Sequence, residues 1–304
     1  MMFTRLVAGL SLGVGVLLPM ASQAQGYAEG VGLSYEVLPL KLTADDTQRT
    51  FRADVFRANV ILPLLVSADS TGSVLVGTSL EHLRFTGERP GFPVRSVTGI
   101  LPLVGYRKRL SPQLELTALA LPALNSDLRD VQARDLTWGG VVRAGYRTSA
   151  RRAYRLTLGY RQQFYGPQYI VLLGLDWQLG QRWRAFGDLP TTFTLSYAAS
   201  PKFAAGFNLN GINTAYRLQD RDRYFQYQQG HYGLFAEAYV SAHWALRATA
   251  AYAVTRRLDV FEKNDQWPAT IDYIGLGQEP VPLNPLIEKG PAFKVALSYR
   301  VATP

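Results

Sequence analysis

The stretch YRLTLGYRQQFYGPQYIVLLGLDWQL, residues 154–179, alternates between apolar and polar or small side chains with a period of two. The apolar positions before the turn at Gly166 are Tyr154, Leu156, Leu158 and Tyr160, and those after it are Tyr169, Val171, Leu173, Leu175 and Trp177. An α-helix would repeat apolar residues about every 3.6 positions, so the pattern predicts two β-strands with unlike faces. Residues 293–301 repeat the same alternation near the end of the chain.

Aromatic residues stand at the ends of these apolar rows, as in residues 138–146 and 154–160. Such residues concentrate at the two interfaces of a membrane. The tripeptide Gly-Tyr-Arg, at residues 105–107, 145–147 and 159–161, places Tyr on the apolar face and Arg on the other each time. The pattern favours strands with lipid outside and a polar lumen inside. A soluble secreted β-sandwich, whose polar face would meet bulk water, is the third alternative.

Turn-forming residues divide the chain after residue 25 into candidate strands joined alternately by tight turns and longer loops. The strands are expected near residues 27–38, 51–66, 73–85, 95–107, 113–123, 134–147, 153–165, 168–180, 182–188, 191–200, 202–212, 230–240, 243–256 and 291–302. Segment 182–188 is short and ambiguous in phase, and without it and one neighbour the count falls to twelve. We therefore predict an all-β, transmembrane, antiparallel up-and-down β-barrel, with fourteen strands favoured over twelve.

The longer connections are expected at the outer end of the barrel, near residues 39–50, 124–134, 213–230 and 257–290. The last of these holds Pro268, Pro280, Pro282 and Pro285, which is too much proline for a strand. No change of composition divides residues 25–304, which are expected to form a single barrel domain.

Residues 1–24 have the form of a cleaved secretory signal peptide, with Arg5 ahead of an apolar run and small residues at Ser22 and Ala24. The apolar run, residues 6–18, is shorter than the roughly twenty residues that a spanning helix needs. The 304 residues contain no cysteine, which excludes a disulfide scaffold and a thiolate metal site. The net charge of +9 would suggest nucleic acid as a partner, but export from the cytoplasm argues against that partner.

The signal peptide, the amphipathic strands, the aromatic ends and the final strand at residues 292–301 together resemble the bacterial outer-membrane β-barrel proteins, including barrels of uncharacterised families. The chain is similar, more loosely, to their monomeric transport or channel members. The resemblance covers nearly the whole mature chain. It implies an outer-membrane location, insertion by the barrel-assembly machinery, and contact with outer-membrane lipid and lipopolysaccharide. The chain departs from the family pattern by continuing to Pro304 beyond its last aromatic residue, Tyr299.

The inward face of the predicted barrel carries more positive than negative side chains. The positive residues are Arg57, Arg107, Arg143, Arg147, Arg155, Arg161, Arg247, Lys294 and Arg300, and the negative residues are Glu81, Glu115, Asp135 and Asp176. A turn near Ala150 would place Arg143 opposite Thr157, and a turn near Gly166 would place Asp176 opposite Thr157 as well. The candidate lumen residues for anions are Arg143, Arg147, Arg155, Arg161, Asp176 and Arg300.

This lumen has two interpretations. An unbalanced row of arginines favours anions, which predicts a passive channel or transporter for small, anionic solutes. Alternatively, the arginines pair with the acids and fill a closed structural or adhesion barrel that neither transports nor catalyses.

The outer segment 220–229 mixes charged and aromatic residues, a composition that can bind sugars or lipid head groups. Its candidate binding residues are Arg221, Arg223, Tyr224 and Tyr227.

Catalysis is not expected, because a hydrolase needs a nucleophile within hydrogen-bond reach of a base. His231 is the only plausible base, with Ser196 or Tyr232 as its nearest conceivable partner. No phosphate-binding loop, cofactor motif or metal-ligand spacing is present in the sequence, so no cofactor is expected.

Overall fold

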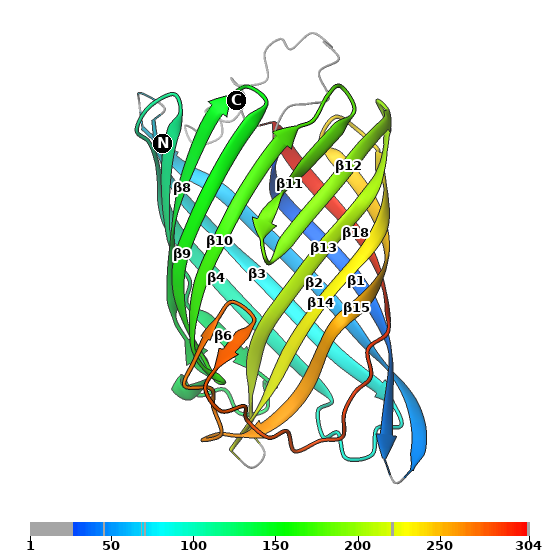
Figure 1. Ribbon diagram of the computed structural model, residues 1–304. Coiled ribbons are helices and arrows are strands. Elements are labelled where there is room, and N and C mark those ends of the chain that lie inside the picture. Colours follow the sequence, from blue (N-terminus) through cyan, green and yellow to red (C-terminus); the bar gives the residue numbers. More distant parts are fainter. Residues whose placement is uncertain (1–26, 45, 68, 70, 220–221, 303–304) are drawn as a thin grey trace, which may run out of the picture.

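The computed structural model describes residues 27–302, except for residues 45, 68, 70, 220 and 221 (Figure 1). The expected signal peptide at residues 1–24 lies outside the described residues. The strands are β1 (Tyr27–Ala44), β2 (Thr47–Val66), β3 (Gly72–Gly87), β4 (Ser96–Arg109), β5 (Leu114–Ala120), β6 (Ala123–Ser126), β7 (Leu136–Thr137), β8 (Gly139–Ser149), β9 (Arg152–Gln163), β10 (Gly166–Gln178), β11 (Trp183–Leu189), β12 (Thr192–Ser200), β13 (Phe203–Leu218), β14 (Arg223–Tyr239), β15 (Trp244–Glu262), β16 (Ala269–Ile271), β17 (Ile274–Leu276) and β18 (Pro291–Ala302), with one short helix, η1 (Ala133–Asp135). Among these residues, no helix is long and apolar enough to span a membrane.

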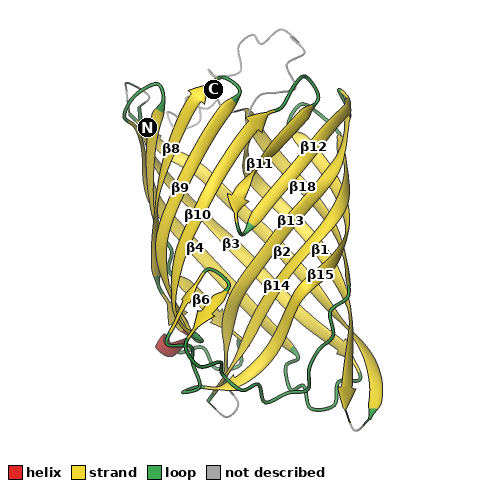
Figure 2. Cartoon of the chain, viewed as in Figure 1, coloured by secondary structure: helices red, strands yellow, loops and turns green. Residues whose placement is uncertain are grey.

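The strands form a closed antiparallel barrel (Figure 2). Closure is direct, because β1 pairs with β2 on one side and with β18 on the other. β5 and β6 are two parts of one wall strand, since both pair with β4, and β7 and β8 continue the next one. Counted in this way, and without the short hairpin β16–β17, which does not run the height of the barrel, the wall has the predicted fourteen strands, which is confirmed. The doubtful segment 182–188 is strand β11.

The outer face of the wall is apolar because alternate side chains of each strand point outward. On β10 the outward row runs from Tyr169 through Leu173, which is 62% exposed, to Trp177. Aromatic rings pack side by side at both ends of this band: Tyr160 and Tyr169 lie 5.7 Å apart at one end, and Tyr154 and Trp177 lie 5.8 Å apart at the other. An exposed apolar band between two aromatic girdles is the surface that a bilayer requires.

The two ends of the barrel differ. At one end, here called the turn end, the connections are short, and Tyr27 pairs with Ala302. At the other, the loop end, the strands continue further than expected. The expected loops 39–50 and 213–230 are mostly strand, because β1–β2 leaves only residues 45–46 and β13–β14 only residues 219–222 between strands. The extended ends of β1, β2, β13 and β14 form strands because many of their side chains are buried at the loop end.

One part of the wall is completed by a segment from far along the chain. The short hairpin β11–β12 turns where Leu189 pairs with Leu173, which leaves residues 166–172 of β10 and 212–218 of β13 without β11 or β12 beside them. The small hairpin β16–β17, orange in Figure 1, lies between them and pairs with β10 through Thr270 and Ile271.

Asp272, at the tip of this hairpin, ties it to both edges of the gap. Its N–H donates to the carbonyl of Tyr169 at 2.9 Å. Its own carbonyl accepts hydrogen bonds from Gln168 of β10 at 3.1 Å and from Asn213 of β13 at 3.2 Å. The expected outer loop 257–290 therefore begins with the last residues of β15 and includes a segment that seals the barrel wall.

Leu173 lies midway along its outward row, so the substitution Leu173→Arg is expected to place a charge near the middle of the bilayer. Its free energy of unfolding, measured by denaturant titration in lipid vesicles, should fall by about 2–4 kcal/mol. The matched variant Leu286→Arg changes a loop residue that is 77% exposed, and should stay within about 0.5 kcal/mol of the parent. Equal losses in the two variants would contradict the placement of β10 in lipid.

Candidate functional site in the barrel lumen

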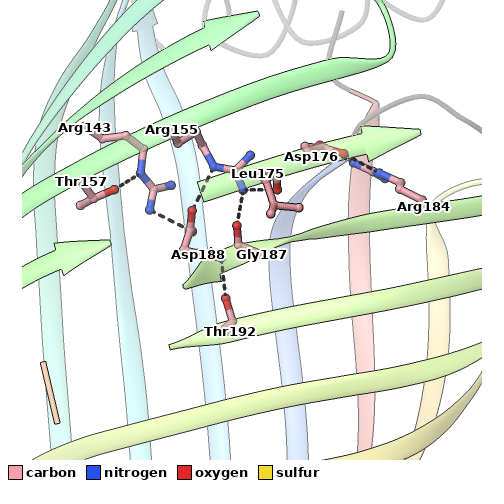
Figure 3. A network of polar contacts seen from close by, with 9 residues as sticks. All are labelled: Arg143, Arg155, Thr157, Leu175, Asp176, Arg184, Gly187, Asp188 and Thr192. Atoms are coloured by element: carbon pink, nitrogen blue, oxygen red, sulfur yellow. Dashed lines mark hydrogen bonds and ion pairs between the residues drawn. The ribbon is translucent and has the colours of Figure 1, made fainter. Parts of the chain in front are cut away.

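Two arginines from neighbouring strands converge on one carboxylate inside the barrel (Figure 3). Arg143 of β8 lies opposite Thr157 of β9, in the register expected for a turn near Ala150. Its Nε donates to the Thr157 hydroxyl at 2.8 Å, and its Nη2 lies 3.2 Å from Asp188. The Nε of Arg155 lies 3.1 Å from the other oxygen of Asp188. Asp188 was missed because the phase of its short strand could not be assigned from the sequence.

The expected position of Asp176 is wrong. Asp176 lies opposite Ala153 and not opposite Thr157, because Gln163 already pairs with Gly166 and only Phe164 and Tyr165 form the turn. Its carboxylate instead accepts a bidentate pair of hydrogen bonds, 2.8 and 2.7 Å long, from Arg184 of β11 (Figure 3).

Arg300 belongs to a third ion-pair cluster. Its Nη1 and Nη2 donate to the carboxylate of Glu237 at 2.7 and 2.5 Å, and the Nε of Arg247 donates to the same carboxylate at 2.7 Å. Glu237 is buried, and it was not among the expected lumen acids. Its inward position follows from the alternation along β14, and Glu237 lies within the strand expected at residues 230–240.

A vestibule with a volume of about 700 Å³ is hollowed into the turn end. Its charged lining consists of seven arginines, Arg107, Arg109, Arg147, Arg151, Arg152, Arg155 and Arg184, and two acids, Glu115 and Asp176. Arg107 lies 3.9 Å from Glu115, whereas Arg155 and Arg184 are bound as described above. Within the described part of the chain, Arg109, Arg147, Arg151 and Arg152 form no ion pair. The vestibule therefore keeps an excess of positive charge.

The loop end of the lumen is closed by a network that crosses the barrel. Arg57 of β2 binds Glu36 of β1 at 2.6 Å and Glu81 of β3 at 2.5 Å. From the opposite wall, the hydroxyl of Tyr216 in β13 donates to Glu81, and the hydroxyl of Tyr227 in β14 accepts from Arg57 at 3.3 Å. Strands on opposite sides of the barrel are thus bound to each other.

Beyond this network the lumen is filled by an apolar core. The rings of Phe85 in β3 and Phe225 in β14 pack edge to face at 5.7 Å, and Phe92 packs against both. The other members come from β1, β2, β3, β4, β13, β14, β15, β18 and the loops: Leu38, Leu40, Leu42, Phe51, Ala53, Val55, Leu83, Val94, Val97, Tyr216, Leu218, Tyr227, Leu258, Val260, Ile287 and Ala292. This packing explains why the strands extend into the expected loops.

The remaining candidate residues lie at the loop end or outside the described residues. Arg161 of β9 lies opposite Gly139 and Gln168, away from the vestibule. Arg223 is bound to Glu262 at 3.1 Å, and Arg221 lies outside the described residues.

The expected binding role of Tyr224 and Tyr227 on an exposed loop is wrong, because both side chains are 0% exposed. They belong to β14, whose extension is packed on both faces. Tyr224 stacks on Phe261 at 5.2 Å, and Tyr227 belongs to the apolar core.

Neither nucleophile considered for His231, Ser196 or Tyr232, lies beside its ring. His231 lies 3.2 Å from the side-chain nitrogen of Gln229. Ser196 of β12 lies opposite Gly206 of β13, and Gly206 lies opposite Phe235 of β14. Ser196 is therefore level with a residue of β14 that is four positions away from His231. Tyr232, the next residue along the strand, points to the other face. Among the described residues, no group of three or more His, Cys, Asp or Glu side chains could hold a metal ion.

Residues 99–266 match the protein family described as Domain of unknown function (DUF6268), over more than half of the chain. The chain belongs to this family. A search of curated proteins finds no significant match to this DUF6268 barrel.

Three outer-membrane proteins are among the solved structures that are similar to this DUF6268 barrel. The COG4313 outer membrane channel from Pseudomonas putida F1 is 10% identical, with 94% of this chain and 100% of that chain covered and a TM-score of 0.44. The P. putida toluene transporter TodX is 9% identical, with 90% and 89% covered and a TM-score of 0.42. The NanC porin is 8% identical, with 89% and 100% covered and a TM-score of 0.38. Because these TM-scores lie below 0.5, the similarities do not assign a function to this chain.

Removing Arg57 from this DUF6268 barrel should be costly because Glu36 is buried and would lose its cation. The variant Arg57→Ala is expected to lose about 3–5 kcal/mol of unfolding free energy. The matched variant Arg107→Ala removes a lumen arginine whose ion pair is about 40% exposed, and should lose at most about 1 kcal/mol. Denaturant titrations of both variants in vesicles test this; a loss below about 1 kcal/mol for Arg57→Ala would refute the cross-barrel network.

Proposed function

We propose that this outer-membrane barrel is a passive channel or transporter for small anionic solutes. The observation that carries the proposal is the vestibule at the turn end, which is lined by seven arginines and two acids. Charge of one sign on the walls of a low-dielectric cleft concentrates ions of the opposite sign. The vestibule therefore attracts anions and repels cations.

The chemistry of the free arginines supports the same solute class. Arg109, Arg147, Arg151 and Arg152 form no ion pair within the described residues, so their guanidinium groups remain available. A guanidinium group presents parallel N–H donors that fit carboxylate and phosphate oxygens. Small carboxylates and phosphates are thus the solutes that this lining would bind.

Transport in this proposal requires the loop end to open. The walls that carry Glu81 and Tyr216 must separate there, and the edge-to-face contact of Phe85 with Phe225 must break. The vestibule would face the periplasm, since short turns lie on the periplasmic side of such barrels. This orientation fits the expected signal peptide and insertion by the barrel-assembly machinery.

A second candidate is a closed structural or binding barrel, which the packing of the loop end favours. The cross-barrel network around Arg57 and the apolar core beyond it leave the two opposite walls in contact. In that case the ion pairs at Asp188 and Glu237 serve to balance buried charge. Such a barrel would show no ionic current.

Planar-bilayer recording of the purified protein in a salt gradient distinguishes the two candidates. We expect a current whose reversal potential shows anion preference. The double variant Arg109→Glu/Arg147→Glu should reduce the anion-to-cation permeability ratio by roughly a factor of ten or invert it. Lys202→Glu, a charge reversal in the β12–β13 turn outside the vestibule lining, is the matched control and should leave the ratio unchanged. No current at all would favour the closed barrel.

A further inference from the structure

A groove on the outer wall of the barrel gathers positive charge. It lies at the loop end of β3 and β4 and has a volume of about 400 Å³. Its lining is formed by His82, Arg84, Phe85, Thr86, Arg89, Arg95 and Ser96, with no carboxylate among them. Arg84 lies opposite Ser96 across the strand pair, on the face away from the lumen, because their neighbours Leu83 and Val97 belong to the apolar core.

The acid that lies opposite Arg84 in the next strand is already paired with other residues. Asp54 of β2 lies opposite Arg84, but its carboxylate already binds Arg52 at 2.7 Å and accepts from the hydroxyl of Tyr35 at 2.5 Å. Within the described residues, Arg84 and Arg95 take part in no ion pair, and both are exposed. Two guanidinium groups are therefore available to an external ligand.

The third arginine is held in place by the loop itself. Arg89 donates from Nε to the carbonyl of Val94 at 3.1 Å and from Nη1 to the carbonyl of Gly87 at 3.2 Å. Burial and the positive charge of Arg95 lower the pKa of Arg89. A bound anion would offset this repulsion, so the groove has both fixed geometry and unbalanced charge.

The height of the groove on the wall indicates where its ligand comes from. Tyr106, in the aromatic girdle at the turn end, and Ser96, at the groove, are ten residues apart on β4. At about 3.3 Å per residue and a tilt of about 40°, ten residues cross about 25 Å, which is the height of the apolar band of such barrels. Phe56, exposed on the outer wall, lies opposite His82 at the edge of this band. The groove therefore opens at the level of the lipid head groups.

We propose that the groove formed by Arg84, Arg89 and Arg95 binds a phosphate group of an outer-leaflet lipid, with the hydroxyls of Thr86 and Ser96 beside it. Phosphate oxygens match the paired N–H donors of the arginines, and the acyl chains of the lipid would continue along the apolar wall below. The site faces away from the lumen, so it goes beyond the proposed transport function and does not depend on it.

The test uses the full-length mature protein in detergent micelles and measures lipid binding by native mass spectrometry. The probes are bis-phosphorylated lipid A, the same lipid without its phosphates, and inorganic phosphate. The double variant Arg84→Gln/Arg95→Gln should bind lipid A at least about tenfold more weakly than the parent. Arg134→Gln/Arg257→Gln, which removes two arginines from the same end but outside the groove, should bind as the parent does.

Each arm has an outcome that overturns the proposal. Equal binding of the lipid without phosphates would show that acyl chains alone are recognised. Inorganic phosphate that displaces lipid A at equal concentration would make the groove a site for the free ion. An equal loss in the Arg134→Gln/Arg257→Gln control would reduce the effect to total charge. Heat-modifiable migration on a gel reports folding, and if the double variant fails to fold, the single variant Arg95→Gln, in the loop before β4, carries the same test.

Discussion

A backbone that crosses a bilayer must satisfy every N–H and C=O group within the protein, because hydrocarbon offers no hydrogen-bond partner. The pairing of β1 with β18 meets this requirement at the ends of the chain. The same requirement explains the hairpin β16–β17. Where β11–β12 stops short, the edges of β10 and β13 would face lipid unpaired, and Asp272 supplies hydrogen bonds to both edges.

Closure of the wall also decides where charge can lie. Side chains that point inward are shielded from lipid, so arginines and acids accumulate there and pair with one another. Most of these pairs join different strands, as Asp188 joins β11 to Arg143 and Arg155. The two ends then differ in what fills the lumen. Apolar rings and the Arg57 network fill the loop end, whereas the vestibule is lined by more arginines than acids.

The strand alternation could be predicted because it is local: each residue faces opposite to its neighbour, whatever lies beyond it. The register of β8 with β9 could be predicted for the same reason, since a tight turn sets it. The predicted register of β9 with β10 was wrong, because the turn between them lies two residues before the expected turn at Gly166. Tyr224 was misplaced because an aromatic, charged segment has the composition of a loop, while burial on both faces made it a strand.

The sequence by itself therefore determined the fold class, the outward apolar rows and the concentration of arginine on the inner face, and it favoured fourteen wall strands over twelve. These follow from a period-two pattern that each strand carries independently. Only the tertiary structure decided which acid binds which arginine, that the loop end is closed, and that residues 269–276 complete the wall. Glu81 and Tyr216 are 135 residues apart in the chain, and no local pattern specifies contacts between strands on opposite sides of a barrel.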